Sequence, residues 1–167
     1  LKKTSFKNIL MREFNLKKIP KINFYDHHLC HLASSHFPSN FKDSLLISAD
    51  GFGDFASTTA ALSKGKRIKF INKILFPHSL GIFYQAFTQF IGFRNYGDEY
   101  KVMGLSGYGK NKFKDEVDKV IKLNKENFEL NLNYFNHHSS NIDMKWNNQS
   151  PKFTNLFNEN LPKLFKY

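Results

Sequence analysis

The sequence has a single cysteine, Cys30, and no apolar run of about 18 residues. One cysteine excludes an internal disulfide and is typical of a protein of the reducing cytoplasm, so we expect a cytoplasmic location. The lack of a long apolar run excludes a membrane-spanning helix. The chain begins Leu1-Lys2-Lys3, without an initiator methionine or a following apolar segment. We therefore expect a fragment of a longer protein and no signal peptide.

Arginine and acidic residues are also scarce. Lys and Arg number 25 against 14 Asp and Glu, a formal net charge of +11, but only Arg12, Arg67 and Arg94 carry guanidinium groups. A basic chain can bind nucleic acid. The lysines, however, are spread along the sequence and no RNA-binding motif accompanies them. We interpret the charge as a solvated basic surface, which also suits phosphorylated small substrates.

The 167 residues are enough for one domain or two part-domains, and the 19 phenylalanines are expected to supply much of the core. A three-stranded antiparallel meander is predicted over 44–76, opened by a turn at Asp50-Gly51 and closed by a hairpin at Lys64-Gly65-Lys66. Residues 136–152 are expected to be loop. The remaining predicted elements are helices over 4–15, from the histidine segment to about Phe37, 80–91, 100–105, 113–123 and 153–166, and strands over 22–25 and 128–130.

The densest cluster of chemically active residues is Asp26-His27-His28-Leu29-Cys30-His31, followed by Asp50-Gly51-Phe52-Gly53-Asp54. In a helix, His27 and His31 lie on one face and can meet one metal ion, whereas His28 points about 100° away. Asp50 ends an apolar run that predicts a strand. A carboxylate there completes a two-histidine, one-carboxylate site that suits Fe(II) or a similar divalent ion. The alternative is a pair of ordinary histidines without metal.

Two further features belong to this cluster. The glycines Gly51 and Gly53 lack a Cβ, so their backbone N–H groups could approach phosphate oxygens. Cys30 is expected to be a small packing residue rather than a nucleophile.

Four blocks then follow one another along the chain. They are 25–35 with 37–39, Asp50-Gly51, 76–81 with Tyr84 and Phe87, and 99–105 with Tyr108-Gly109. Together these blocks resemble the signature of O-carbamoyltransferases of the nodulation-protein and cephem-carbamoylation type. The resemblance implies an α/β chain with part of the actin/sugar-kinase/Hsp70-like (ribonuclease H-like) fold, in which two lobes face each other across a nucleotide cleft.

The resemblance also implies a division of the chain. Residues 1–41 would be the C-terminal part of the first lobe, with the HxxxH helix. Residues 42–167 would be an incomplete second lobe, with the meander over 44–76 and then helices. The metal site would lie between the lobes.

That family transfers a carbamoyl group from carbamoyl phosphate, through a carbamoyl-adenylate made with ATP, to an acceptor hydroxyl. The resemblance therefore implies ATP with Mg and Fe(II) or another divalent metal as cofactors. The partners implied are carbamoyl phosphate and a small-molecule hydroxyl acceptor. Apart from the resemblance, we expect neither a membrane nor nucleic acid as a partner, and a second copy of the chain is a candidate. The metal ligands would be His27, His31 and Asp50. A fourth ligand, expected from a downstream aspartate, has no clear match in this chain.

The resemblance gives roles to four more residues. Gly51 and Gly53 would contact phosphate, and Glu99 would bind ribose hydroxyls. Lys101 would bind phosphate or form a structural ion pair, and an exposed charge pair on a short helix is the alternative for both charged residues. Ser79 is interpreted as a helix N-cap. No residue is assigned as the catalytic base.

Two other functions stay open. One is a tRNA threonylcarbamoyl-type transferase, which also uses an HxxxH pair, although the blocks at 78–81 and 99–105 follow the small-molecule pattern. The other is a non-catalytic basic module that binds RNA or a partner protein. The chain also departs from the family, because it has Ser106-Gly107 where a proline is usual. We expect no counterpart here of the family's first strands, the rest of its second lobe or its C-terminal domain, which leaves no complete ATP site. We therefore expect this chain alone to be inactive or only weakly metal-binding.

Overall fold

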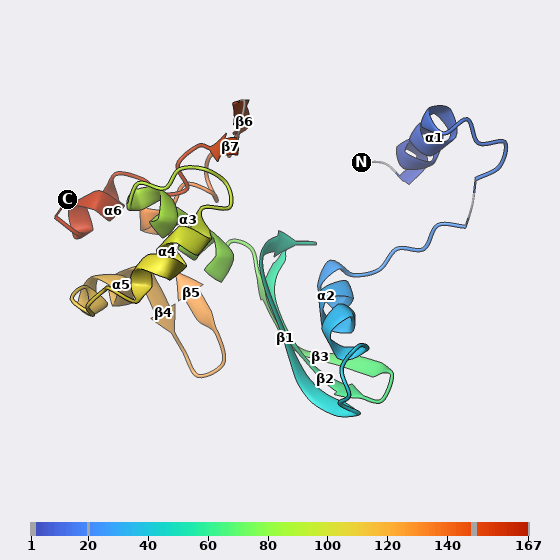
Figure 1. Cartoon of the computed structure of the whole chain (residues 1–167), viewed down its shortest axis with the longest axis horizontal. Coiled ribbons are helices and arrows are strands. Elements are labelled where there is room, and N and C mark those ends of the chain that lie inside the picture. Colours follow the sequence, from blue (N-terminus) through green and yellow to red (C-terminus); the bar gives the residue numbers. More distant parts are fainter. Residues whose placement is uncertain (1–2, 20, 148–149, 167) are drawn as a thin grey trace.

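A computed structural model describes residues 3–19, 21–147 and 150–166, and within them the protein is a mixed α/β structure with three small antiparallel sheets (Figure 1). The elements are α1 (Lys3–Glu13), α2 (His27–His36), β1 (Asp43–Gly53), β2 (Ala56–Lys64), β3 (Arg67–Leu75), α3 (Leu80–Phe90), α4 (Glu99–Ser106), α5 (Lys114–Val120), β4 (Ile121–Leu123), β5 (Phe128–Leu130), the 3-10 helix η1 (Leu132–Tyr134), β6 (Met144–Asn147), β7 (Ser150–Phe153) and α6 (Asn160–Leu164). None of the described helices has the length and apolar character to cross a membrane.

The predicted meander is confirmed as a sheet of order β1-β2-β3. Its second turn contains Gly65 at φ +56°, the backbone conformation that hairpin glycines favour. The prediction of a turn at Asp50-Gly51 was wrong. The turn between β1 and β2 lies at Asp54-Phe55, where both residues have positive φ. β1 continues to Gly53 through an irregular register between Ala49 and Gly53. Asp50 therefore lies in a bulged part of β1, where glycine is well tolerated.

Helix α2 covers one face of this sheet (Figure 1). It begins where the Asp26 carboxylate accepts a hydrogen bond from the Leu29 N–H at 2.9 Å. This start places His28, Leu32 and His36 on the buried side at four-residue spacing. Leu32 packs with Leu46 and Ala61 in a small core of its own. This contact joins residues on the two sides of the expected lobe boundary, which lies between residues 41 and 42. The boundary itself stays a prediction.

A second, larger core fills the C-terminal part. Partly buried phenylalanines surround it, as the composition predicts, while Phe24, Phe41 and Phe55 are exposed elsewhere. α3 begins at the predicted cap Ser79 and is followed by Gly92 at φ +105°. The fully buried members of this core are Ala86, Val120, Leu130, Phe135, Leu156 and Leu161.

Four further local predictions were wrong. Residues 21–26 form no strand. The helix expected over 113–123 ends at Val120, because the next three residues pair as β4 with β5. The expected loop 136–152 contains β6 and the start of β7, although its residues 148–149 lie outside the described part. Pro151, which sits opposite Trp146, weakens the strand signal in this hairpin. Of residues 153–166, only Asn160–Leu164 are α-helical.

Candidate metal centre and adjoining pocket

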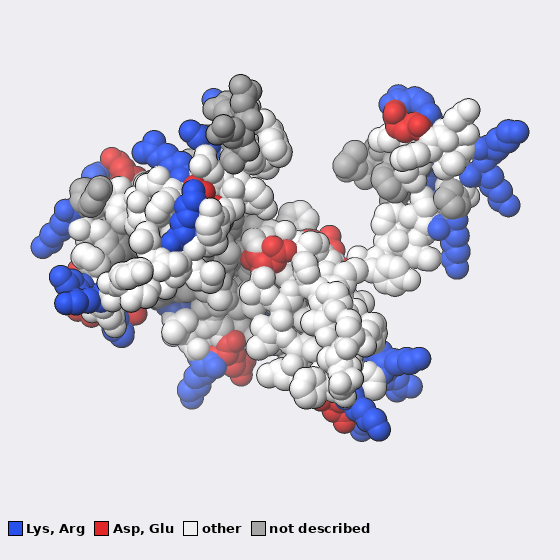
Figure 2. Space-filling model, viewed as in Figure 1, with Lys and Arg blue, Asp and Glu red and all other residues white. Residues whose placement is uncertain are grey.

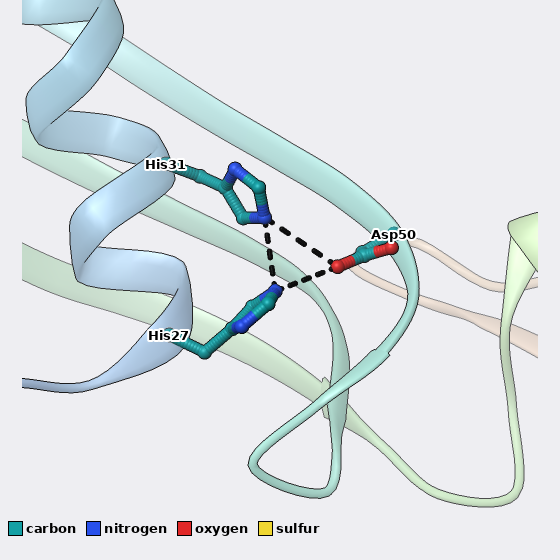
Figure 3. A group of neighbouring side chains, drawn as sticks. All are labelled: His27, His31 and Asp50. Atoms are coloured by element: carbon teal, nitrogen blue, oxygen red, sulfur yellow. Dashed lines mark hydrogen bonds and ion pairs between the residues drawn. The ribbon is translucent and has the colours of Figure 1, made fainter. Parts of the chain in front are cut away.

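Two histidines of α2 and one aspartate of β1 converge, and they are the three predicted ligands (Figure 3). The Nε2 atoms of His27 and His31 lie 2.9 Å apart. The Asp50 Oδ2 lies 2.7 Å from the His27 Nε2 and 3.5 Å from the His31 Nε2. The helix and the strand thus bring together residues that are 23 positions apart in the sequence.

The separations of these atoms fit one divalent ion. Nitrogen and oxygen ligands lie about 2.1 Å from such an ion, so two of them are about 3.0 Å apart at 90° and about 3.4 Å apart at the tetrahedral angle. With neutral rings the three contacts cannot all be hydrogen bonds, because each Nε2 either carries a proton or offers a lone pair. A cation at their common centre satisfies all three atoms at once. Two imidazoles and one carboxylate are also the donor set that Fe(II) favours.

Asp50 is an anionic member of this set. Partial burial alone would raise the pKa of its carboxyl, but the hydrogen bonds from His27 and from the Gly51 N–H outweigh that effect and lower the pKa. The Gly51 N–H donates to Oδ1 at 2.6 Å, which leaves Oδ2 directed at the histidines. The carboxylate is therefore ionised and oriented at neutral pH.

The end of β1 is shaped around the His27 ring. Gly53 is buried there, and a Cβ added to it would lie 2.0 Å from the His27 Cδ2 and 2.4 Å from its Cγ. The His27 backbone N–H also donates to the Asp54 Oδ2 at 2.9 Å. The structure thus places Gly53 against a candidate metal ligand, and it gives Asp54 a role at the start of α2 that the sequence did not indicate.

The start of α3 supports Asp50 from the other side. The Ser79 Oγ accepts from the Ile82 N–H, which confirms the N-cap, and it lies 3.1 and 2.8 Å from the Asp50 and Gly51 carbonyl oxygens. A Cβ on Gly81 would lie 2.9 Å from the Asp50 carbonyl oxygen. Both residues therefore hold the Asp50-Gly51 peptide in place, a contact that the N-cap pattern alone could not reveal.

A pocket of about 510 Å³ opens next to Asp50. Gly51 and Glu99, which we expected at a nucleotide site, line it together. Lys101 instead forms an ion pair with Asp98, whose Oδ1 lies 2.7 Å from the lysine Nζ; this hydrogen bond lowers the pKa of Asp98. The remaining residues that line the pocket are Gly81, Tyr84, Gln85, Tyr96 and Gly97.

Other features of the surface differ from this site. Cys30 is exposed, so its expected packing role was wrong. Lysine and arginine side chains are scattered over the face shown in Figure 2 and do not gather in one patch there.

Comparison with known proteins gives the family. The family model described as "Carbamoyltransferase N-terminus" matches residues 1–163. The uncharacterized protein sll1178 of Synechocystis is 38% identical over 143 residues, which are 84% of this chain and 22% of that protein. Nodulation protein NolNO of Sinorhizobium fredii is 38% identical over 108 residues, 64% of this chain and 16% of its own. Nodulation protein NolO of Bradyrhizobium diazoefficiens is 39% identical over 84 residues, 50% of this chain and 15% of its own.

The chain thus spans 15–22% of the length of these curated relatives. Because the family model covers almost all of this chain, the chain belongs to the carbamoyltransferase family, in the region of that family's N-terminal domain.

Proposed function

We propose that this chain is part of an ATP-dependent O-carbamoyltransferase. In this reaction a carbamoyl group passes from carbamoyl phosphate, through a carbamoyl-adenylate, to a hydroxyl of a small-molecule acceptor. The observation that carries the proposal is the convergence of His27, His31 and Asp50 beside a pocket lined by Gly51 and Glu99. Family membership supports the transfer of a carbamoyl group. The single cysteine supports a cytoplasmic location.

The three ligands suit an ion that also meets a substrate. A divalent ion, Fe(II) by its donor set, would neutralise charge on phosphate or carbamoyl oxygens. Asp50 supplies one negative charge and the two imidazoles are neutral ligands, so the set compensates only part of the ion's charge. Three ligand atoms would fill only three positions around such an ion, which would leave coordination positions for substrate oxygens.

The pocket beside the triad suits a nucleotide. Gly51 would present its backbone to phosphate oxygens, and the Glu99 carboxylate would accept hydrogen bonds from ribose hydroxyls. Lys101 is held by Asp98, which favours its structural alternative. We further propose that residues 1–41 and 42–167 contribute to two lobes of a ribonuclease H-like fold. On this basis the chain alone stays inactive, because it contains a small part of the relatives' length.

The metal content of the anaerobically purified chain tests this proposal. We expect stoichiometric Fe(II) or another divalent metal in the wild type, and its loss in the double variant His27→Ala plus His31→Ala. His138→Ala, outside the triad, is the control and should keep the metal. The same measurement on the full-length protein covers the case of weak binding by the short chain. Metal-free protein in both lengths contradicts the catalytic proposal, and salt-sensitive RNA binding by the double variant would instead support the basic binding module.

A further inference from the structure

Helix α2 carries four histidines, of which His27 and His31 face Asp50 and two are buried against the sheet. The buried pair is His28, which is 0% exposed, and His36, which is 4% exposed. Both rings use both of their nitrogens in contacts with β1, β2 or the turn after β2. Nothing in the proposed chemistry requires either residue, so their function is a separate question.

The contacts of His28 fix its tautomer. Its Nε2 lies 3.0 Å from the Ala56 carbonyl oxygen, which can only accept, so this nitrogen carries the proton and donates. Its Nδ1, 3.0 Å from the Ser48 Oγ, must then accept from the serine hydroxyl. The ring is therefore attached at two points, one on β1 and one at the start of β2.

Both attachment points lie close to the three candidate ligands. Ser48 precedes Asp50 by two residues on β1, and both side chains meet histidines of α2. The His28 ring centroid is 5.4 Å from that of His27 and 6.1 Å from that of His31. His28 thus joins α2 to the strand that supplies the carboxylate, directly beside the place where the three ligands meet.

Small rotations of α2 would separate these ligands. The Cα atoms lie about 2.3 Å from a helix axis, and an imidazole extends the ligand nitrogen to about 6–7 Å from it. A rotation of about 15° therefore moves that nitrogen by about 1.6–1.8 Å. Metal–ligand distances tolerate about 0.2 Å. The rotation of α2 about its axis must be set, and a rigid ring bonded at both nitrogens sets it.

We propose that His28 is a positioning residue for the candidate metal centre: through Ser48 and Ala56 it fixes the rotation and height of α2 on the sheet so that His27 and His31 meet Asp50. This inference rests on the proposed function, since it concerns the same centre. His28 does not touch the metal in this proposal, and it acts only through the helix that carries two of the ligands.

His36 provides a matched control on the same helix. Its Nε2 donates to the Gly65 carbonyl oxygen at 2.8 Å, and its Nδ1 lies 3.2 Å from the Ser44 Oγ. It therefore has the same kinds of partners as His28, a serine hydroxyl and a backbone carbonyl. Its attachment is at the far end of α2, at the turn between β2 and β3. Its loss should affect the fold as the loss of His28 does, but not the ligand geometry.

The test compares His28→Leu with His36→Leu in the full chain. Urea unfolding without metal measures stability, and anaerobic titration with Fe²⁺ against a competing chelator measures metal affinity. The absorption spectrum of bound Co²⁺ reports the geometry of the ligands around the metal. We expect the urea midpoint to fall in both variants, because each removes a buried ring that bonds a serine hydroxyl and a backbone carbonyl oxygen. Only His28→Leu should weaken metal affinity, by tenfold or more, and change the Co²⁺ spectrum. His36→Leu should stay within threefold of the wild type.

Two results overturn the inference alone: unchanged affinity in His28→Leu, or an equal loss of affinity in both variants, which would indicate general loosening. If His28→Leu does not fold, His28→Gln replaces it, because the glutamine amide keeps a donor for the Ala56 carbonyl. His28→Gln should show a smaller loss of metal affinity in the same direction. Wild-type affinity in His28→Gln also overturns the inference. A wild type that takes up neither Fe²⁺ nor Co²⁺, as this chain and as the full-length protein, overturns the metal centre itself, and this is measured first. The failure of the inference and the failure of the proposed function are thus distinguished.

Discussion

Replacing Gly53 by alanine tests whether the close approach of β1 keeps His27 in position. The new Cβ would lie 2.0 Å from the His27 Cδ2, whereas carbon atoms in contact lie about 3.5–4.0 Å apart. The ring must therefore move by about 1.5 Å or more. If the movement is directed away from Asp50, the 2.7 Å separation between the His27 Nε2 and the Asp50 Oδ2 grows to about 4 Å. One of the three ligands would then be lost.

The effect on stability should be smaller than the effect on binding. The His27 side chain is already 41% exposed, so it can turn toward solvent without opening a cavity. We expect a change in unfolding free energy of about 1 kcal/mol or less. Metal affinity should fall by about 100-fold or more, which corresponds to about 2.7 kcal/mol.

Calorimetric titration with Co²⁺ or Fe²⁺ and urea unfolding measure the two quantities. The control is Gly51→Ala on the same strand, where an added Cβ meets nothing within 4 Å. Its metal affinity should stay within threefold of the wild type. The reasoning is refuted if Gly53→Ala binds metal as the wild type does, or if Gly51→Ala loses as much affinity.

Two further predictions concern the surroundings of the site. Ser79→Ala removes a helix cap and the hydroxyl that donates to part-buried carbonyl oxygens, so it should lower the unfolding free energy by about 2 kcal/mol and also weaken metal binding. Ser106 is exposed, and Ser106→Ala should change stability by less than about 0.5 kcal/mol in the same urea assay. Asp98 has a lowered native pKa through its hydrogen bond with Lys101, so its stabilising effect is present at neutral pH and is lost as the pH falls below about 4 toward the native value. Asp98→Asn should therefore flatten the dependence of the unfolding free energy on pH below about pH 4. An unchanged pH dependence in that range would contradict a stabilising role of the Asp98–Lys101 ion pair.

The convergence of the three candidate ligands was predictable because it depends on local patterns. Four-residue spacing on a capped helix places His27 and His31 together, and an apolar run before Asp50 indicates the strand that faces them. The position of Asp50 within β1 was not predictable from the glycines beside it. In this bulge Gly53 lies against His27 of α2, and the backbone of Gly51 lies against Gly81 of α3. A sequence pattern cannot distinguish such a bulge from a turn.

The supports of the site could not be predicted, because they depend on contacts between distant segments. Periodicity shows that His28 points away from the other two histidines, but its partner Ser48 is 20 residues along the chain. Ser79 reads as a helix cap, and only the fold brings its hydroxyl to the Asp50 carbonyl. In the same way, β6 and β7 stabilise each other by pairing and carry little strand signal of their own.

The spacing of the site along the chain has a consequence for its order of assembly during synthesis. The three candidate ligands lie between residues 27 and 50, and their supporting sheet ends at Leu75, whereas the pocket needs Glu99. At about 5–20 residues per second, the ribosome adds the 49 residues from Asp50 to Glu99 in roughly 2–10 s. The sheet and its helix can form in that interval, since their contacts are close in sequence. The nascent chain would then hold the three candidate metal ligands before the pocket lined by Glu99 exists. On the proposed function, metal loading can therefore precede nucleotide binding.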